Sequence, residues 1–158
     1  MKIVLLSLLG LTVFAAPGHH AADVVAYPEG YRSWAHVRTT FVDSTHPRFA
    51  SIGGFQHFYA NAEAMRGHRT RVFPEGSVLV VDWLDLTTQA GASREGARRQ
   101  LDVMVRDSVR FASTGGWGFR RFQGDSHDQD AAAPTPSQCF ACHAAQAKDG
   151  LVLSTYRP

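Results

Sequence analysis

Short runs of β-branched and aromatic residues recur along the chain, and turn-forming residues separate them. Runs of this kind are typical of strands. The run 78–83 is almost entirely apolar, as in a well-buried strand, and Pro74 and Gly76 form a turn before it. The alternation over 101–106 favours a strand, although helical spacing over 98–111 is a competing interpretation. The pattern predicts extended segments at 39–42, 55–59, 69–72, 77–86, 101–106 and 117–122, and a short one at 151–154.

Helical spacing is confined to short segments. Aromatic residues recur at a helical interval within 29–38, which predicts a short amphipathic helix there. Asn61 is placed to cap a brief helix over 62–66, and a further helix is expected around 139–143. Polar and turn-forming residues predict loops at 43–47, 89–95 and 124–136.

Composition excludes several classes of protein. The chain has 158 residues and a formal net charge of +2, so no basic stripe indicates binding to nucleic acid or to anionic lipid. Its length suits one domain with one core. The chain contains two cysteines, Cys139 and Cys142, and both belong to a single short motif near the C-terminus.

That motif is Cys139-Phe140-Ala141-Cys142-His143, a C-x-x-C-H sequence. Two thiols one helical turn apart can both add to the vinyl groups of a porphyrin, and the adjacent imidazole then faces the iron. C-x-x-C-H is therefore the attachment signature of a c-type haem. The motif predicts one haem c, bound covalently through Cys139 and Cys142, with His143 as the iron ligand.

Three other interpretations of the motif are weaker. A structural zinc site needs four Cys or His ligands, usually in two pairs, and here there is one pair. A thioredoxin-like redox pair needs a βαβ pattern, and too few residues follow His143 to complete one. A plain disulfide is compatible with an exported chain, but it leaves the histidine unexplained.

The N-terminus supports the haem interpretation. Lys2 precedes an apolar run that ends in small residues, as in a secretory signal peptide. We expect a signal peptide over 1–22, with cleavage after Ala15 or Ala22, and a single haem-binding domain over 23–158. Export to the periplasm fits covalent haem, which bacteria attach outside the cytoplasmic membrane. An uncleaved membrane anchor is the alternative, because the apolar run approaches the length of an anchor.

Several further strings make a family resemblance specific. They are Tyr59-Ala60-Asn61, Phe73-Pro74-Glu75-Gly76-Ser77, Val103-Met104-Val105-Arg106-Asp107, Thr114-Gly115-Gly116-Trp117-Gly118-Phe119, and the C-x-x-C-H motif ahead of Leu153-Ser154-x-Tyr156-Arg157. In this order they resemble the cytochrome P-460 family, which includes the β class of cytochromes c-prime. The resemblance implies an α+β fold, mainly an antiparallel sheet with a few short helices, and haem c on a C-terminal helix. It also implies a homodimer and a pentacoordinate iron with His143 as proximal ligand.

The position of the motif agrees with an open iron site. In common electron-transfer cytochromes a methionine downstream of the motif supplies the sixth ligand, whereas here any distal group must come from upstream. Met65 and Met104 are more plausible as core residues. The histidines that could ligate are more plausibly surface or hydrogen-bonded groups; they are His36, His57 and His68.

Members of the family differ in the residues that line the haem pocket on the side opposite the proximal histidine. Hydroxylamine-oxidising members carry a lysine cross-linked to the porphyrin, but the lysines here are Lys2 and Lys148. The segment expected to supply the link instead contains Arg69 and Arg71, and arginine is a poor nucleophile. The chain therefore resembles the non-cross-linked β class, whose pockets are capped by aromatic rings and bind nitric oxide and carbon monoxide.

The candidate distal residues are less specific. Phe41 and Phe58 are the expected aromatic caps, with core packing as the alternative. Arg69 or Arg71 could donate hydrogen bonds to a haem propionate or to a bound ligand, with solvated surface charge as the alternative. A distal acid for proton transfer could come from a loop of three carboxylates, although solvation is their more common state; they are Asp125, Asp128 and Asp130.

Together these features predict an exported cytochrome that reversibly binds a small diatomic ligand such as nitric oxide. One alternative is a haem enzyme that oxidises hydroxylamine or transforms a nitrogen oxide or peroxide at the same site. A second alternative is a simple electron carrier with a redox partner protein.

Overall fold

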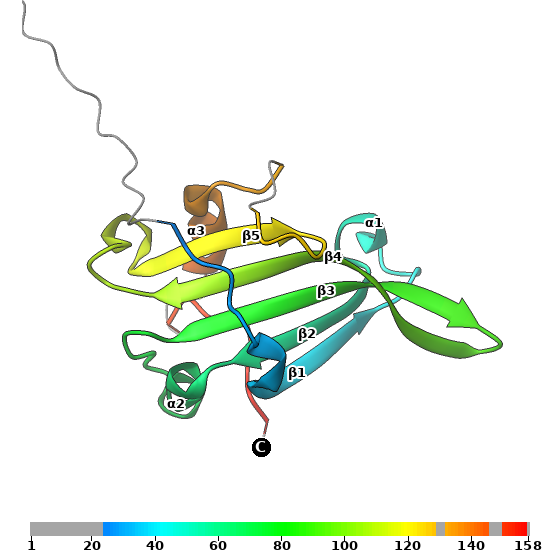
Figure 1. The fold of residues 1–158 in the computed structure, drawn as a ribbon, viewed down its shortest axis with the longest axis horizontal. Coiled ribbons are helices and arrows are strands. Elements are labelled where there is room, and N and C mark those ends of the chain that lie inside the picture. Colours follow the sequence, from blue (N-terminus) through cyan, green and yellow to red (C-terminus); the bar gives the residue numbers. More distant parts are fainter. Residues whose placement is uncertain (1–23, 129–131, 146–149, 158) are drawn as a thin grey trace, which may run out of the picture.

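Five strands form one antiparallel sheet in the order of the chain (Figure 1). The structure is a computed structural model that describes residues 24–128, 132–145 and 150–157. Because each strand pairs with the next, every connection is local. The strands are β1 (Ala35–Val42), β2 (Gly54–Ala60), β3 (Val78–Gln89), β4 (Ala92–Arg106) and β5 (Trp117–Gln123).

The helices are short and lie between or after the strands. They are α1 (Phe49–Ile52), α2 (Ala62–Thr70) and α3 (Pro136–Ala144), with 3-10 turns η2 (Tyr31–Ser33) and η3 (Ala112–Thr114). The expected α+β architecture, mainly an antiparallel sheet with a few short helices, is confirmed. The segment 1–22, expected to be a signal peptide, lies outside the described residues. Within the described residues, no helix has both the length and the apolar character needed to cross a membrane.

Each face of the sheet carries its own hydrophobic cluster, because side chains alternate along a strand. The N-terminal segment crosses one face, while α3 and the C-terminal segment lie on the other (Figure 1). On the first face Val25, Leu101 and Phe122 are buried together. On the second face Leu79, Phe119 and Val152 are buried together, with Cys139 against them. The covered second face is therefore the one on which α3 holds the C-x-x-C-H motif.

A charged network lies under the first face. Asp82 is fully buried and accepts hydrogen bonds from Tyr31 Oη (2.6 Å), Arg32 Nη2 (2.7 Å) and Arg98 Nε (2.7 Å). Burial by itself would raise the pKa of Asp82, but these hydrogen bonds outweigh it and hold the pKa below its ordinary value. The network therefore keeps an ionised carboxylate inside the protein.

Most predicted elements are confirmed, including the strands at 39–42, 55–59, 77–86, 101–106 and 117–122. The competing helix over 98–111 is wrong, because β4 continues to Arg106. Asn61 caps α2 as predicted, with Oδ1 accepting from Ala64 N at 2.9 Å. The helix itself continues four residues beyond the predicted end, to Thr70.

Four predicted segments are wrong. In 29–38 only the turn η2 is helical, because pairing with β2 makes the chain extended from Ala35. Residues 69–72 are not extended, since α2 ends with Arg71 in the left-handed region. The expected loop 89–95 is the tip of the β3–β4 hairpin, where Ala90 and Gly91 both have positive φ. Residues 151–154 form no strand, and Leu151 has a φ of 66°.

Candidate functional site

The sequence before the motif fixes where α3 begins. The Thr135 side chain accepts from Gln138 N, and the Gln138 side chain accepts from Thr135 N, which is a capping box. Pro136 occupies the first turn, where its missing N–H leaves no hydrogen bond unmade. From this start Cys139, Cys142 and His143 fall at i, i+3 and i+4 and share one face of the helix.

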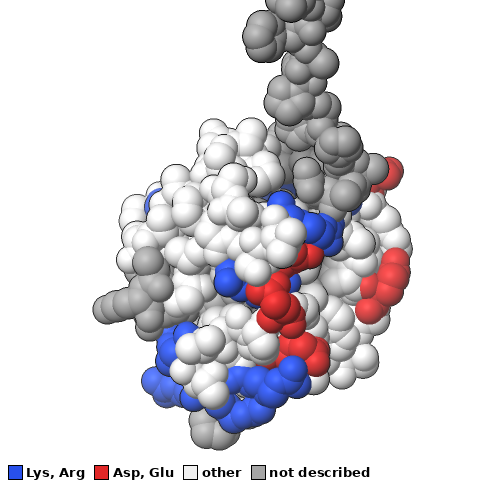
Figure 2. Space-filling model, turned by 90° about the vertical axis from the view of Figure 1, so that its left-hand side faces the viewer, with Lys and Arg blue, Asp and Glu red and all other residues white. Residues whose placement is uncertain are grey.

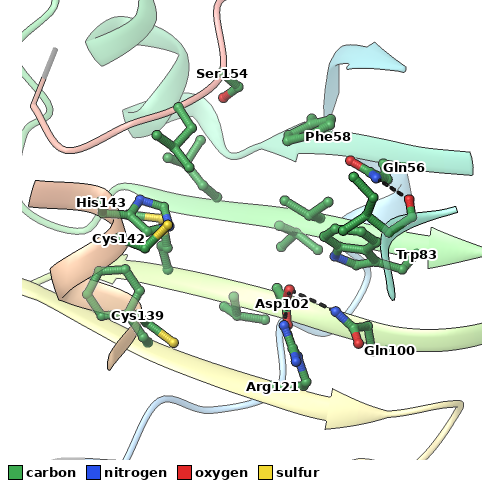
Figure 3. A pocket seen from close by; sticks show the side chains of 18 of the residues that line it. Gln56, Phe58, Trp83, Gln100, Asp102, Arg121, Cys139, Cys142, His143 and Ser154 are labelled. Atoms are coloured by element: carbon green, nitrogen blue, oxygen red, sulfur yellow. Dashed lines mark hydrogen bonds and ion pairs between the residues drawn. The ribbon is translucent and has the colours of Figure 1, made fainter. Parts of the chain in front are cut away.

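That face looks into a cavity between α3 and the sheet. The cavity has a volume of about 690 Å³, within the range of about 300–1,000 Å³ typical of ligand pockets. Cys139, Cys142 and His143 all line it, and residues 152–154 close one side. Figure 3 shows Cys142 and His143 at one end of this space and Trp83, Gln56 and Gln100 at the other.

The sheet lines the cavity with three rows of side chains that run across the strands. Neighbouring rows are two residues apart along each strand, a distance of about 7 Å. The first row is Leu79, Met104 and Phe119; the second is Arg38, Phe58, Val81, Asp102 and Arg121; the third is Thr40, Gln56, Trp83 and Gln100. The first row is apolar, whereas every side chain of the third row carries a hydrogen-bonding group.

His143 lies beside the first row and has a defined tautomer. Its ring centroid is 5.1 Å from that of Phe119. Its Nδ1 lies 2.7 Å from the carbonyl oxygen of Leu151, which can only accept, so Nδ1 carries the proton. Nε2 is then the nitrogen with a lone pair available for a metal.

The segment that holds His143 is itself fixed. Leu151 adopts a left-handed conformation that is unusual for a residue with a side chain, and this conformation accompanies the contact with His143. The preceding carbonyl, of Gly150, accepts a hydrogen bond from Trp117 Nε1 at 3.1 Å. Trp117 is almost fully buried, so the core of the second face supports the orientation of the imidazole.

An ion pair forms part of the second row. Arg121 donates from Nε and Nη2 to the two oxygens of Asp102, at 2.6 and 2.9 Å. Gln100 Nε2 also donates to Asp102, at 3.1 Å. Burial raises the pKa of the neighbouring Cys139 thiol, and the Asp102 carboxylate raises it further. Cys139 is therefore a neutral thiol at pH 7, unlike the low-pKa cysteine of a redox enzyme.

These features fit a haem c. Both thiols are free and line the same cavity as the imidazole, and that cavity is large enough for a cofactor. Leu79, Val81 and Phe119 provide the apolar walls that a porphyrin requires. No group of three or more His, Cys, Asp or Glu side chains in the described part of the chain could hold a metal ion alone. A single imidazole beside two thiols suits an iron that a porphyrin already holds.

The distal residues expected from the sequence lie in different places. Phe58 lines the cavity in the second row. Phe41 pairs with Phe55 on the opposite face, with ring centroids 5.0 Å apart and 45% of its surface exposed, so it is not placed to cap this cavity. Arg69 lies in the last turn of α2 and Arg71 ends that helix, and neither lines the cavity. Figure 2 shows arginine side chains gathered at the end of the molecule where Figure 1 places α2.

The candidate sixth ligands are also separated from the far end of the cavity. Met104 lines the first row, on the side of His143, and Met65 packs against the core of the second face. His36 and His57 both hydrogen-bond to Thr39 on the opposite side of the sheet from Phe58. His68 is buried against Phe73, with ring centroids 5.3 Å apart.

The three carboxylates of the loop are not part of the cavity. Asp125 pairs with Arg98 near the first face, and Asp128 is exposed. Asp130 lies outside the described residues. None of these places an acid beside the third row.

Sequence reasoning missed the polar residues that do line the cavity. Gln56, Trp83 and Gln100 share the third row because of the register of β2, β3 and β4. Alternation along each strand separates these positions from their buried neighbours, but pairing between strands is needed to bring them together. Arg38 and Arg48 also line the cavity and could bind haem propionates.

Comparison with known proteins adds a family. A family model described as Cytochrome P460 matches residues 28–154. A search of curated proteins found no match for the chain.

Proposed function

The chain belongs to the cytochrome P460 family, a family of haem c proteins, and on that premise we propose that it binds nitric oxide reversibly at an open haem iron. In this proposal Cys139 and Cys142 hold the porphyrin through thioether bonds, and His143 Nε2 is the proximal ligand. The iron supplies the position at which a diatomic molecule binds. One observation carries the proposal: His143 has its free nitrogen at one end of a cavity whose other end contains no methionine or histidine side chain among the described residues.

The protein tunes this site through the partner of the imidazole. A hydrogen bond from Nδ1–H to a carbonyl fixes the ring orientation and makes Nε2 more basic. Leu151 provides that carbonyl at 2.7 Å. A neutral carbonyl attracts the Nδ1 proton of His143 less strongly than a carboxylate would. His143 therefore keeps the character of an ordinary imidazole ligand, as expected for a site that binds a gas and releases it.

The absence of a ligating side chain from the third row favours binding over simple electron transfer. An electron carrier benefits from two fixed axial ligands, because its iron then changes little between oxidation states. Thr40, Gln56, Trp83 and Gln100 form the third row, and none is a usual ligand of haem iron. Space is therefore available there for an external ligand.

A haem enzyme acting on hydroxylamine or another nitrogen oxide is the second candidate. The hydrogen-bonding character of the third row favours it, since polar substrates need such partners. The lysine needed for the porphyrin cross-link is not present at 69–71, where the chain has Arg-Thr-Arg. We therefore place ligand binding first.

The cellular setting is part of the same proposal. The apolar run near the N-terminus and the covalent haem both support export to the periplasm. The family resemblance supports a homodimer, and we also propose a redox partner protein.

An optical spectrum of the purified, reduced protein tests the function. We expect an ordinary c-type spectrum of a high-spin, five-coordinate iron that changes on addition of nitric oxide. A strongly red-shifted Soret band would indicate a cross-linked porphyrin and overturn the assignment to the non-cross-linked class. A sharp low-spin α band before any ligand is added would favour the electron carrier. Steady turnover of hydroxylamine without a cross-link would move the protein to the enzyme class.

A further inference from the structure

The glycine-rich string 114–119, which the haem-attachment motif does not account for, lies against the segment that holds His143. It joins the turn η3 to the strand β5, and α3 contacts both of these elements (Figure 1). A Cβ atom on Gly115 would lie 2.8 Å from Leu151 Cδ1 and 3.0 Å from Phe140 Cε2. Gly115 therefore leaves room for one side chain of the C-x-x-C-H motif and for one side chain of the segment after it.

Trp117, from the same string, holds the carbonyl that precedes Leu151. Its side chain is 1% exposed, and Nε1 donates to the Gly150 carbonyl at 3.1 Å. That carbonyl belongs to the peptide unit between Gly150 and Leu151, so the hydrogen bond fixes the plane from which Leu151 continues. Val152, the next residue, is buried in the cluster of the second face. The Leu151 carbonyl, which meets His143 Nδ1 at 2.7 Å, is therefore fixed from both sides.

Phe73 packs against both groups that share the hydrogen bond of Trp117. Its ring centroid is 5.6 Å from that of Trp117, in an edge-on arrangement. A Cβ atom on Gly150 would lie 3.0 Å from Phe73 Cδ2, which is tighter than an ordinary contact, and Gly150 also has a positive φ of 67°. Glycine suits this position for both reasons, and the close packing keeps its carbonyl against the indole.

The strength of the hydrogen bond at His143 depends on this support. Donation from Nδ1 makes Nε2 more basic, and a hydrogen bond weakens steeply when its acceptor moves out of line. Leu151 has a left-handed φ of 66°, which costs free energy in a residue with a side chain, so the surrounding structure must hold it. Whatever fixes residues 150–152 therefore also fixes the basicity of the proximal nitrogen.

We propose that Trp117 is a positioning residue for the proximal ligand, and that its indole N–H sets how strongly His143 binds the haem iron. Trp117 acts through Gly150 and the Leu151 carbonyl, and it touches neither the imidazole nor the iron in this role. The inference rests on the proposed coordination of the iron by His143. It goes further by naming a residue outside the motif that tunes this bond.

Resonance Raman spectroscopy of the reduced holoprotein without added ligand measures the stretching frequency of the bond between the iron and His143. Trp117→Phe keeps an aromatic ring in the core but removes the N–H donor. We expect the band to shift to lower frequency and to broaden, because the Leu151 carbonyl is held less firmly and Nε2 becomes less basic. An unshifted band would overturn the role of Trp117.

Phe122→Leu is the matched control. Phe122 is fully buried in the cluster of the opposite face, so this substitution loosens the core on that face. Its iron–histidine band should stay at the frequency of the unaltered protein. A shift equal to that of Trp117→Phe would show a general effect of a loosened core, and Trp117 would have no special role.

A second replacement covers the case that Trp117→Phe does not fold. A tryptophan analogue in which sulfur replaces the indole N–H keeps the shape of the ring, and its incorporation in place of Trp117 should shift the band in the same direction. An unchanged frequency there would overturn only the role of Trp117. If the unaltered reduced protein showed no iron–histidine band, coordination by His143 at an open site would be overturned, and this inference with it.

Discussion

The imidazole of His143 donates from Nδ1 to the carbonyl oxygen of Leu151 at 2.7 Å. The two residues lie on different segments, one on α3 and the other after it, and Leu151 adopts a positive φ of 66°. The carbonyl therefore determines which nitrogen of His143 faces the cavity. Orientation of the proximal ligand depends on a backbone group that follows the motif.

Removal of the imidazole should leave a space that a free ligand can refill. In His143→Gly we expect the thioether bonds to remain but the proximal ligand to be lost, with a corresponding change in the optical spectrum. Added imidazole should restore the spectrum of the unaltered protein, because the apolar wall formed by Phe119 is retained. Titration of the variant with imidazole measures this recovery.

The matched control is His46→Gly, which removes an exposed histidine from the loop after β1. Its spectrum should match that of the unaltered protein with or without imidazole. If His143→Gly kept the original spectrum without imidazole, another side chain would be the ligand, and the assignment of His143 would be wrong.

Covalent attachment should depend on both thiols of α3. The double variant Cys139→Ala, Cys142→Ala should retain no haem after acid-acetone extraction, since the chain has no other cysteine. Each single variant should keep one thioether bond, so mass spectrometry should still detect the mass of haem on the chain. Haem that stays covalently bound to the double variant would contradict attachment at these residues.

Which parts of the site could be predicted from the sequence depends on how far apart along the chain the contacting residues lie. Cys139, Cys142 and His143 were identified because their spacing is local to one helical turn. The hydrogen bond from His143 to Leu151 was not foreseen, because 151–154 was expected to be a strand. A positive φ in a leucine has no sequence signal of the kind that glycine provides.

The two phenylalanines illustrate the same limit for the distal wall. Phe55 and Phe58 are three apart in β2, so alternation places them on opposite faces, and pairing of Phe41 with Phe55 puts Phe41 with the latter. The sequence contains that alternation, but the position of α3 decides which face lines the cavity. The segment 69–71 does not line the cavity for a different reason. Helix α2 extends to Thr70, so this segment forms the end of that helix.

Loss of the buried carboxylate should destabilise the fold strongly. Asp82→Asn would remove the buried anionic partner of Arg98, whose side chain is only 12% exposed, and leave it with the exposed Asp125. Breaking a buried pair in this way typically costs about 3–5 kcal/mol of unfolding free energy. Urea denaturation measures the difference. Glu63→Gln, in the exposed pair with Arg66, should change stability by no more than about 0.5 kcal/mol.

Acidification should remove the same contribution in the unaltered protein. Because the pKa of Asp82 is lower in the folded state than the ordinary value of 3.8, the unfolded chain binds its proton first as the pH falls. The stabilisation is complete above about pH 4 and is lost as the pH falls through the folded pKa. The stability of Asp82→Asn should therefore depend less on pH below about pH 4. An identical acid dependence in both proteins would contradict an ionised Asp82.

The cap of α2 should contribute more than a usual N-cap. Asn61 Oδ1 accepts from Ala64 N at 2.9 Å and from Val78 N at 3.0 Å, while Nδ2 donates to Gly76 at 2.8 Å. The side chain thus joins the start of α2 to the start of β3. Asn61→Ala should lower the unfolding free energy by about 2 kcal/mol, at the upper end for a cap. Asn61→Asp retains the acceptors and should lose less; equal losses would show that the acceptor role is minor.

His68 should make the stability of the fold sensitive to mild acid. Burial, and the positive charge of Arg71, lower the pKa of His68 below its ordinary value of 6.5, and its ring nitrogens have no hydrogen-bond partner among the described residues. The unfolded chain therefore binds a proton at a higher pH than the folded chain does, so stability falls as the pH decreases below about 6.5. His68→Leu retains an apolar contact with Phe73 and should remove this part of the pH dependence. Thermal unfolding between about pH 7.5 and pH 5 measures it, with exposed His46→Ala as the control. If His68→Leu and the unaltered protein lost stability in parallel over this range, His68 would not be the group that titrates.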